Sequence, residues 1–226
     1  MNKTLPLLIF LFLTVDLSAQ KPTEYEQFSG KLIYSIRITD TSLQRMIPCR
    51  QMVIYTNDTL IRIENETDQL GKQVIIKHLT LNKSYLLLNT PMNNYAIQTD
   101  HNDGKEIKYP YSFTSKRGKR KFLGIKAKRL MVSHENFLEP IEFLYLPLFS
   151  PKYINTLENF PGLPVLYYIS SVDGTYEFRL ISIEKSTPNH DLFGIPSDYK
   201  RVTFDNFLNE MLNYQQQGEE MEIEHE

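Results

Sequence analysis

The stretch QMVIYTNDTLIRIEN, residues 51–65, decides the fold class of this chain. Two short strand-like runs, 51–56 and 59–65, flank the dipeptide Asn57-Asp58. Asn and Asp tolerate the positive backbone φ angle that tight hairpin turns require. The stretch therefore predicts a β-hairpin, and the sequence on both sides of it repeats the same pattern.

Upstream, Leu32, Tyr34, Ile36 and Ile38 alternate with polar residues, which is typical of a strand buried on one face. Downstream, the runs 72–80 and 84–89 predict a second hairpin, and 94–99 predicts a further strand. Short strands at this regular spacing favour an all-β sandwich, barrel or meander. The run Tyr85 to Leu88 is apolar on both faces, so we expect a second layer to cover the sheet there.

The second half of the chain continues the β pattern. Residues 100–104 form a polar loop, and 105–121 are polar and basic and are expected to be exposed. Further strands are predicted at 122–132, 139–146, 164–170 and 175–184, with one helical turn at 152–159. In the last strand the alternation changes phase at Ile181, which predicts a β-bulge or a sharp twist.

One helix is predicted, at the C-terminal end. Thr203 is a suitable N-cap, and a stripe of apolar residues at helical spacing follows it. The stripe consists of Phe204, Phe207, Leu208, Met211 and Leu212. From Gln215 the chain is polar and acidic, so residues 215–226 are expected to be a disordered tail.

The N-terminus has the layout of a secretory signal peptide. A weakly positive start precedes an apolar run at 5–15, and Ala19 offers a small residue for cleavage. The run is shorter than the roughly 20 residues that span a bilayer as a helix. We expect a signal peptide at 1–19, a leader at 20–29 and one β-rich domain at 30–214. The protein should then be exported, periplasmic or extracellular, and soluble.

The single cysteine, Cys49, restricts the class of exported protein. It cannot form an internal disulfide, and it does not lie at the end of the signal peptide, where a lipoprotein would be acylated. We therefore do not expect a disulfide-stapled scaffold or a lipoprotein. Arg50 is adjacent but no histidine is near in sequence, so a small half-buried residue is favoured over a reactive thiol.

The charge is unevenly distributed around a net value of −2. Basic residues crowd one stretch: Lys116, Arg117, Lys119, Arg120, Lys121, Lys126, Lys128 and Arg129. The first five of these, Lys116 to Lys121, form a candidate patch for an anionic membrane surface or lipopolysaccharide. The alternative is a solvated strand face whose charge is offset by the glutamates of the tail. Nucleic acid is not an expected partner of an exported protein with net negative charge.

Motifs for metal binding or catalysis are absent from the sequence. The five histidines show no ligand spacing, and no His-Glu-x-x-His or Cys-x-x-Cys occurs. There is no Gly-x-Ser-x-Gly elbow and no glycine loop that would cradle phosphate. We therefore expect no metal, no cofactor and no enzyme activity, although catalytic groups that assemble only in space would escape this search.

Several short motifs, in the right order, resemble the GLPGLI family of exported Bacteroidota proteins. Residues 160–166 (FPGLPVL) are similar to its Gly-Leu-Pro-Gly-Leu-Ile signature, although Pro164-Val165 stands where Gly-Leu is usual. Residues 122–128 (FLGIKAK) are similar to a family strand in which Ala127 replaces the usual cysteine. Residues 142–147 and 192–200 resemble two further family motifs. The motif residues Phe160, Pro161, Gly162, Leu163, Pro164 and Val165 are expected to be structural.

The resemblance implies a fold like the curved half-barrel of LolA-type lipoprotein carriers, and it implies no established activity. The fold class we expect is mainly β: a curved antiparallel sheet or half-barrel with a C-terminal helix and few short helices. The leading function is a non-catalytic binder of a lipid or hydrophobic peptide in the cell envelope, in an apolar cavity closed by the helix at 204–212. The alternatives are an envelope scaffold without a ligand and, third, a hydrolase.

Overall fold

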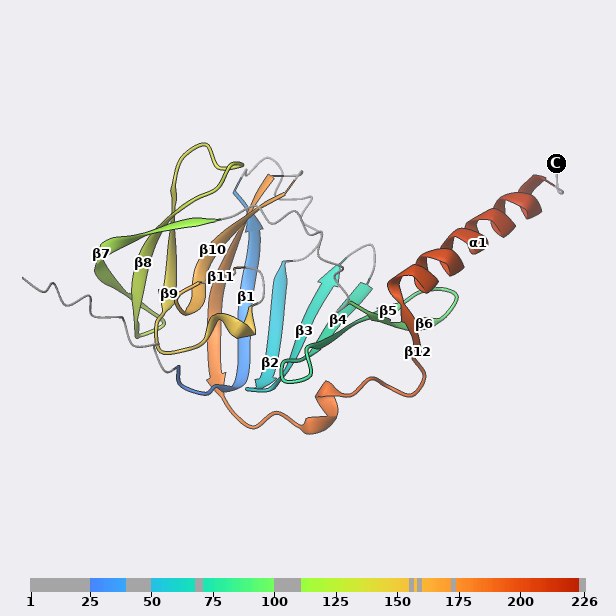
Figure 1. The fold of residues 1–226 in the computed structure, drawn as a ribbon, viewed down its shortest axis with the longest axis horizontal. Helices are drawn as coiled ribbons and strands as arrows, with labels where there is room; N and C mark the ends of the chain where they lie inside the picture. The colour runs from blue at the N-terminus through green and yellow to red at the C-terminus, as the bar shows by residue number, and fades with distance from the viewer. Residues whose placement is uncertain are drawn as a thin grey trace, which may run out of the picture.

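A computed structural model describes residues 25–39, 50–67, 71–99, 111–154, 157, 160–171 and 174–223. These residues form one sheet of 12 strands in the order β12-β6-β5-β4-β3-β2-β1-β11-β10-β9-β8-β7, followed by one helix (Figure 1). The strands are β1 (Ser29–Ile38), β2 (Gln51–Asn57), β3 (Leu60–Thr67), β4 (Gly71–His78), β5 (Lys83–Asn89), β6 (Asn94–Gln98), β7 (Ser112–Phe122), β8 (Ile125–Ser133), β9 (Ile141–Leu146), β10 (Leu163–Ser171), β11 (Gly174–Lys185) and β12 (Lys200–Thr203). The helix is α1 (Phe204–Ile223), and two short 3-10 turns are η2 (Pro151–Tyr153) and η3 (His190–Phe193).

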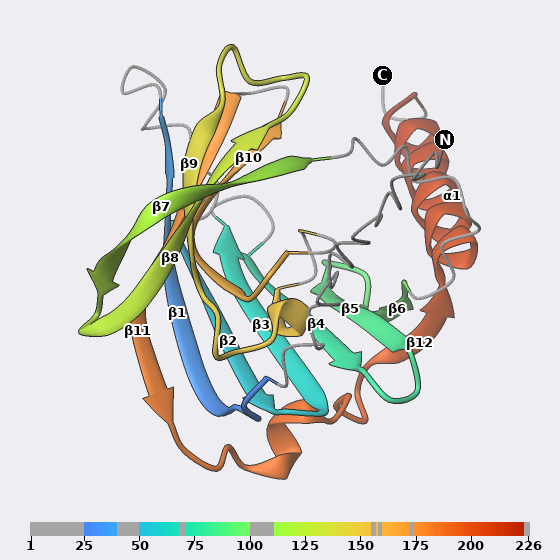
Figure 2. The same ribbon diagram turned by 60° about the vertical axis from the view of Figure 1, so that its left-hand side comes forward.

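The sheet is curved and open, so the predicted fold class is confirmed. Its neighbouring strands run antiparallel except for β12, which pairs with β6 in parallel. The curvature leaves a hollow on one side, and the connection from β9 to β10, with η2 in it, crosses that hollow (Figure 2).

The hairpin of residues 51–65 forms as predicted. Asp58 has a φ angle of 77°, the left-handed conformation that the turn requires. The side chain of Asn57 closes the turn, since its Oδ1 accepts hydrogen bonds from the backbone nitrogens of Thr59 at 3.2 Å and Leu60 at 2.7 Å. The predicted irregularity in β11 is also present: Ile181 is skipped in the pairing with β1, between Ile33 and Tyr34.

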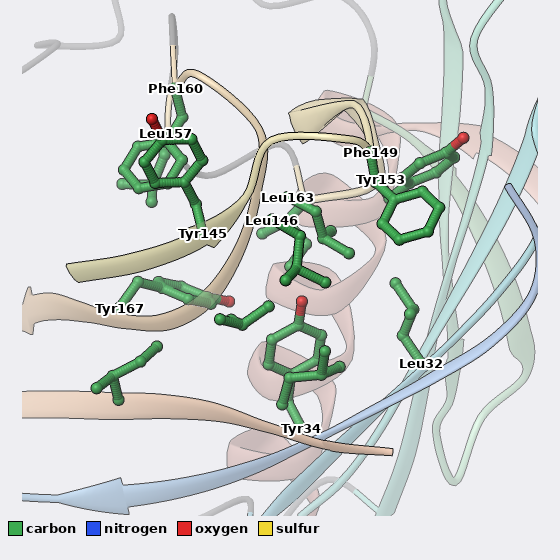
Figure 3. Close-up of a cluster of buried hydrophobic side chains, with 14 of the residues drawn as sticks. Leu32, Tyr34, Tyr145, Leu146, Phe149, Tyr153, Leu157, Phe160, Leu163 and Tyr167 are labelled. Atoms are coloured by element: carbon green, nitrogen blue, oxygen red, sulfur yellow. The ribbon is translucent and has the colours of Figure 1, made fainter. Parts of the chain in front are cut away.

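The hydrophobic core occupies the hollow. Leu32 and Tyr34 of β1 are fully buried there, and the β9–β10 connection fills the space above them with Phe149, Tyr153 and Phe160 (Figure 3). Tyr34 donates a hydrogen bond from its hydroxyl to the backbone oxygen of Pro164 at 2.7 Å, and burial raises its pKa well above the ordinary value. The core is therefore formed by the sheet and by one long connection that includes η2, and none of the described residues of α1 belongs to it.

A polar contact fixes this connection to the hairpin at residues 51–65. The hydroxyl of Tyr153 donates to Asp58, and the ammonium of Lys152 lies 2.8 Å from the same carboxylate. The backbone nitrogen of Phe28 donates to the Tyr153 hydroxyl at 3.0 Å. Burial alone would raise the pKa of Asp58, but the hydrogen bonds from Lys152 and Tyr153 hold it below its ordinary value.

The second face of the sheet is covered where the apolar run at residues 85–88 predicted a cover. Val74, Ile76, Leu87 and Ala96 form a small buried cluster on the outer face of β4, β5 and β6. Ile195 and Tyr199, which follow η3, pack against them together with Tyr85. The guanidinium of Arg62 donates to the backbone oxygen of Leu192 at 2.9 Å, which attaches this segment to β3.

Residues 112–121 are exposed as predicted, apart from the half-buried Phe113, but they belong to edge strand β7, which the sequence pattern did not indicate. The strand predicted at 122–132 begins only at Ile125, after a tight turn. Leu123 and Gly124 have φ angles of 48° and 77°, which reverse the chain into β8. Between Phe113 and Phe122, β7 has no apolar side chain, so it lacks the alternation that predicts a strand.

The two ends of the domain also differ from the prediction. Phe28, at the end of the predicted leader, is only 1% exposed in the core, and Glu26 forms an isolated bridge with Phe149. At the other end, α1 continues past Gln215 to Ile223, so the predicted boundary of the disordered tail is wrong. The predicted N-cap is confirmed, because the Thr203 hydroxyl accepts from the backbone nitrogen of Asn206 at 3.3 Å.

The prediction that the C-terminal helix closes the cavity is wrong, because α1 does not cover the hollow. The helix extends away from the sheet (Figure 1) and contacts only its edge, where Phe207 packs on Tyr95 with ring centroids 5.2 Å apart. Phe204, Leu208 and Leu212 of the apolar stripe remain exposed. In the part of the chain that the structure describes, no helix has the length and apolar character needed to cross a membrane. The predicted signal peptide and Cys49 lie outside the described residues.

Candidate functional site

An open pocket of about 680 Å³ lies beside the filled part of the hollow. Its size falls within the range of roughly 300–1,000 Å³ that is usual for small-molecule sites. The apolar lining is Met52, Ile54, Ile63, Ile75, Leu79, Leu86, Ile154, Tyr167, Ile169 and Phe178. The polar lining is Asn65, Lys77, His78, Asn82, Lys83, Ser84 and Thr99.

The apolar floor is a row of side chains directly opposite one another across four strands. Ile54 pairs with Ile63, Ile63 with Ile75, and Ile75 with Leu86. Residues paired in this way project from the same face of a sheet, so the row forms a continuous surface. The alternation within each strand therefore builds the floor of the pocket, and β-branched residues are well suited to such positions.

The wall toward β10 and β11 is aromatic. Tyr167 stacks on Phe178 with ring centroids 4.8 Å apart and an angle of 11° between the rings. Tyr167 also contacts Tyr34 edge to face, and its burial raises the pKa of its hydroxyl. Ile154 completes this wall from the β9–β10 connection, so the pocket ends where the filled core begins.

A polar row borders the apolar floor at the end nearest the β4–β5 turn. Lys77 pairs with Ser84, and the hydroxyl of Thr99 donates to the Ser84 hydroxyl at 2.9 Å. His78 and Lys83, also paired, contribute the last side chains of the lining. This end of the pocket therefore combines two ammonium groups with neutral donors, and no aspartate or glutamate is among the described residues that line the pocket.

The hydrogen bond of the His78 ring determines which of its nitrogens carries a proton. Its Nδ1 atom accepts a hydrogen bond from the backbone nitrogen of Leu81 at 3.2 Å. A neutral imidazole that accepts at Nδ1 has its proton on Nε2. His78 therefore offers Nε2–H as a donor, and the same bond fixes the ring beside the turn.

Asn65 borders the floor at the opposite end. Its Oδ1 atom is buried and has no hydrogen-bond partner among the described residues. An unsatisfied buried acceptor costs roughly 1–3 kcal/mol. Asn65 stands four positions along β3 from Ile61, the partner of Lys77, which corresponds to about 13 Å of strand. Polar groups thus stand at both ends of an apolar floor.

The predicted basic patch is present on the β7–β8 hairpin, but it is divided between two faces. Lys116, Arg120 and Arg129 surround the carboxylate of Glu142 on β9, at 3.0 Å from Lys116 Nζ and 3.4 Å from Arg120. The hydrogen bond from Arg129, with Lys116 and Arg120 beside it, lowers the pKa of Glu142. One alternative for this patch was that the glutamates of the tail offset its charge. In the structure, Glu142 offsets part of it. Arg117 and Lys119 lie on either side of Gly118, within a bulge of β7.

The predicted structural motif, residues 160–165, lies in the filled core and not in the pocket. Phe160 packs against Phe113, Phe143 and Tyr145 with ring centroids 5.4, 6.2 and 5.7 Å apart. A Cβ atom on Gly162 would lie 2.4 Å from the backbone oxygen of Leu146. The glycine is needed for this close approach of two segments of the chain.

Neither a metal cluster nor a visible catalytic group was predicted. Within the described ranges, no group of three His, Cys, Asp or Glu side chains could hold a metal ion. The hydrolase alternative called for a buried carboxylate or a histidine at the cavity. His78 meets that condition, but its Nδ1 accepts a hydrogen bond from the Leu81 backbone, whereas in a catalytic triad that nitrogen donates to a carboxylate.

Sequence reasoning found the strands of the pocket and missed its polar groups. Asn65, Lys77, His78 and Lys83 were not singled out, since nothing in a linear pattern brings them to one surface. The available signal was that the polar residues Lys77 and His78 follow directly on the apolar run at 74–76.

Comparison of the chain with protein-family models and with curated proteins finds no match. The resemblance to the GLPGLI family thus stays a prediction.

Proposed function

We propose that the pocket binds an amphipathic lipid-like molecule, with an acyl chain on the apolar floor and an anionic head at the polar row. The protein would act as a non-catalytic binder of this ligand in the cell envelope. The observation that best supports the proposal is the row of four paired apolar residues across β2 to β5, which lies beside two lysines in an open pocket.

The chemistry of the two ends selects the ligand class. A carboxylate or phosphate is attracted to the ammonium group of Lys83 and can accept a hydrogen bond from His78 Nε2. The floor excludes a second charge, because an unpaired charge on apolar surface is strongly disfavoured. A long-chain fatty acid is the simplest molecule with this pattern, and a donor such as a hydroxyl near its far end would satisfy Asn65 Oδ1.

Titration with a fluorescent long-chain fatty acid tests the proposal. Filling the floor by Leu86→Trp should abolish uptake, whereas Leu81→Trp, on an exposed turn residue outside the lining, should leave it unchanged. Native mass spectrometry of protein recovered from the periplasm should show a stoichiometric lipid that solvent extraction removes. A clean apo mass together with no uptake by the unmodified protein would reject lipid binding.

The role of the polar row needs a separate comparison. Lys83→Gln should weaken binding of the fatty acid by up to about fivefold, the size expected for one exposed ion pair. The same change should not affect displacement by the fatty alcohol of equal chain length. Lys31→Gln, a lysine outside the lining, is the matched control. Equal losses for acid and alcohol would assign Lys83 to packing and not to recognition of the head.

A second candidate function has an observation of its own. The β9–β10 connection fills much of the hollow with the protein's own side chains, as a scaffold without a ligand would require. If the fatty acid experiments fail, we expect the protein to act through protein partners in the envelope. Cross-linking in the native envelope, followed by identification of the linked chains, would then be the test.

A further inference from the structure

We infer that the tip of the β7–β8 hairpin docks on an anionic phospholipid surface through four lysines and one leucine. The residues are Lys119, Lys121, Lys126, Lys128 and Leu123, and we call them the lysine face. This inference is independent of the proposed ligand pocket, because the lining of the pocket includes none of these residues.

The register of the hairpin places the four lysines on one face. Lys119 is directly opposite Lys128, and Lys121 is directly opposite Lys126. Directly opposite residues, and residues two apart on one strand, share a face. All four side chains are exposed, and no ion pair joins any of them to an acid among the described residues.

On the opposite face of the same hairpin the cations share a carboxylate partner. Lys116, Arg120 and Arg129 all contact Glu142 there. Like charges directly opposite one another destabilise a hairpin, so two such pairs on the lysine face are unfavourable for folding. An external anion would relieve this repulsion, and the contrast between the faces indicates where that anion binds.

Charged edge strands also prevent pairing between sheets, and β7 is an edge strand. That role needs charge only on the edge, however, whereas Lys128 stands where β8 is paired with both β7 and β9. Edge protection therefore does not explain the whole lysine face.

An exposed apolar residue at the apex favours a lipid surface over a soluble anion. Leu123 is 48% exposed and sits in the turn with a φ angle of 48°, next to Gly124. A leucine at a tip bordered by lysines can enter the boundary between headgroups and acyl chains while the lysines contact lipid phosphates. A free phosphate ion would gain nothing from contact with the apolar side chain of Leu123.

Co-sedimentation with vesicles tests the inference, using protein recovered from the periplasm. Vesicles of phosphatidylethanolamine with phosphatidylglycerol should bind the protein at low salt, and vesicles of phosphatidylcholine alone should not. Raising the salt concentration should weaken binding, because exposed charges are screened within about 10 Å at 0.1 M.

Two variants with the same change in charge separate the faces. Lys121→Gln with Lys126→Gln removes one opposed pair from the lysine face and should weaken binding about tenfold or more. Lys116→Gln with Arg120→Gln removes the same charge from the face of Glu142 and should have little effect. The first variant should melt no lower than the unmodified protein, since repulsion is removed. Equal weakening by both variants, or no vesicle binding by the unmodified protein, would overturn the inference.

Leu123→Asn distinguishes a lipid surface from a soluble anion, and asparagine tolerates the positive φ angle of the turn. We expect Leu123→Asn to bind vesicles more weakly than the unmodified protein at both low and high salt. Leu81→Asn, at another exposed turn, should bind as the unmodified protein does. If Leu123→Asn binds vesicles as the unmodified protein does, while inorganic phosphate competes in the low millimolar range, the site is for a soluble phosphate and docking on lipid is rejected.

Discussion

The two halves of the hollow solve the same packing problem in different ways. Around β9, β10 and β1 the inner surface is covered by the β9–β10 connection, whose Phe149, Tyr153 and Phe160 are almost fully buried. Around β2 to β5 the inner surface is a similar apolar row, but it is left open as a pocket. Ile154 of this connection lines the pocket and marks the boundary between the filled half and the open half. The comparison shows that strand patterning creates an apolar surface, while the reach of one connection decides how much of it remains available.

Core truncation should separate the two halves most strongly. Phe160→Ala removes a ring that contacts three other aromatic rings, so we expect a loss of about 3–5 kcal/mol in the free energy of unfolding. Ile75→Ala, in the floor of the open pocket, should cost about 2 kcal/mol or less, because its side chain already borders a void. Chemical denaturation of both variants is the measurement. Equal losses would contradict the division into a filled and an open half.

A glycine substitution gives a finer test of the filled half. Gly162→Ala places a Cβ 2.4 Å from the backbone oxygen of Leu146, which cannot move aside as a flexible side chain could. We expect destabilisation of about 1–3 kcal/mol, the usual cost of overpacking. Gly194→Ala is the matched control, since its nearest contact is the Asp191 backbone oxygen at 3.4 Å and its φ angle is −80°. Thermal melting that ranks the two variants equally would refute the close-approach role of Gly162.

Asp58 should make the attachment of the connection dependent on pH. The pKa of Asp58 is lower in the folded state than its ordinary value, so its contribution to stability is present above that ordinary value, near 3.9, and is lost as the pH falls through the folded value. Asp58→Asn keeps the left-handed turn and removes the charge. We expect a loss of about 1–2 kcal/mol at pH 7 and convergence with the unmodified protein once the pH has fallen through the folded-state pKa of Asp58.

Hydrogen exchange would locate the effect of that variant. Protection should fall in the β9–β10 connection, where Tyr153 and Lys152 bind Asp58, and not in β4 and β5. Uniform loss of protection would show that Asp58 supports the whole domain and not one boundary of the pocket.

The strands were largely predictable, and particular residues show why. The turn at Asn57-Asp58 is specified by two adjacent residues, and the bulge at Ile181 is indicated by a phase change within a single strand. Strand β7 was missed because it has no apolar side chain between Phe113 and Phe122 and so lacks the alternation that predicts a strand. The helix was found from its stripe and its N-cap, but its position at the edge of the sheet was not, because an apolar stripe does not specify which surface it contacts.

The candidate site was not predictable to the same extent. Lys77, His78 and Lys83 are ordinary polar residues of a hairpin in the sequence, and they become one end of a pocket only beside Thr99 and the floor of Ile54 to Leu86. The basic cluster was evident from composition, but its division into a face paired with Glu142 and a lysine face depends on that residue of another strand.

The sequence by itself determined the class of fold, the position of the turns and the presence of an apolar inner surface, because these follow from alternation and turn chemistry over a few neighbouring residues. Only the tertiary structure decided which part of that surface is filled and which lysines have no acidic partner among the described residues. Both depend on contacts between residues far apart in the chain, such as Tyr153 with Asp58 and Arg129 with Glu142, and local patterns contain no information about those pairings.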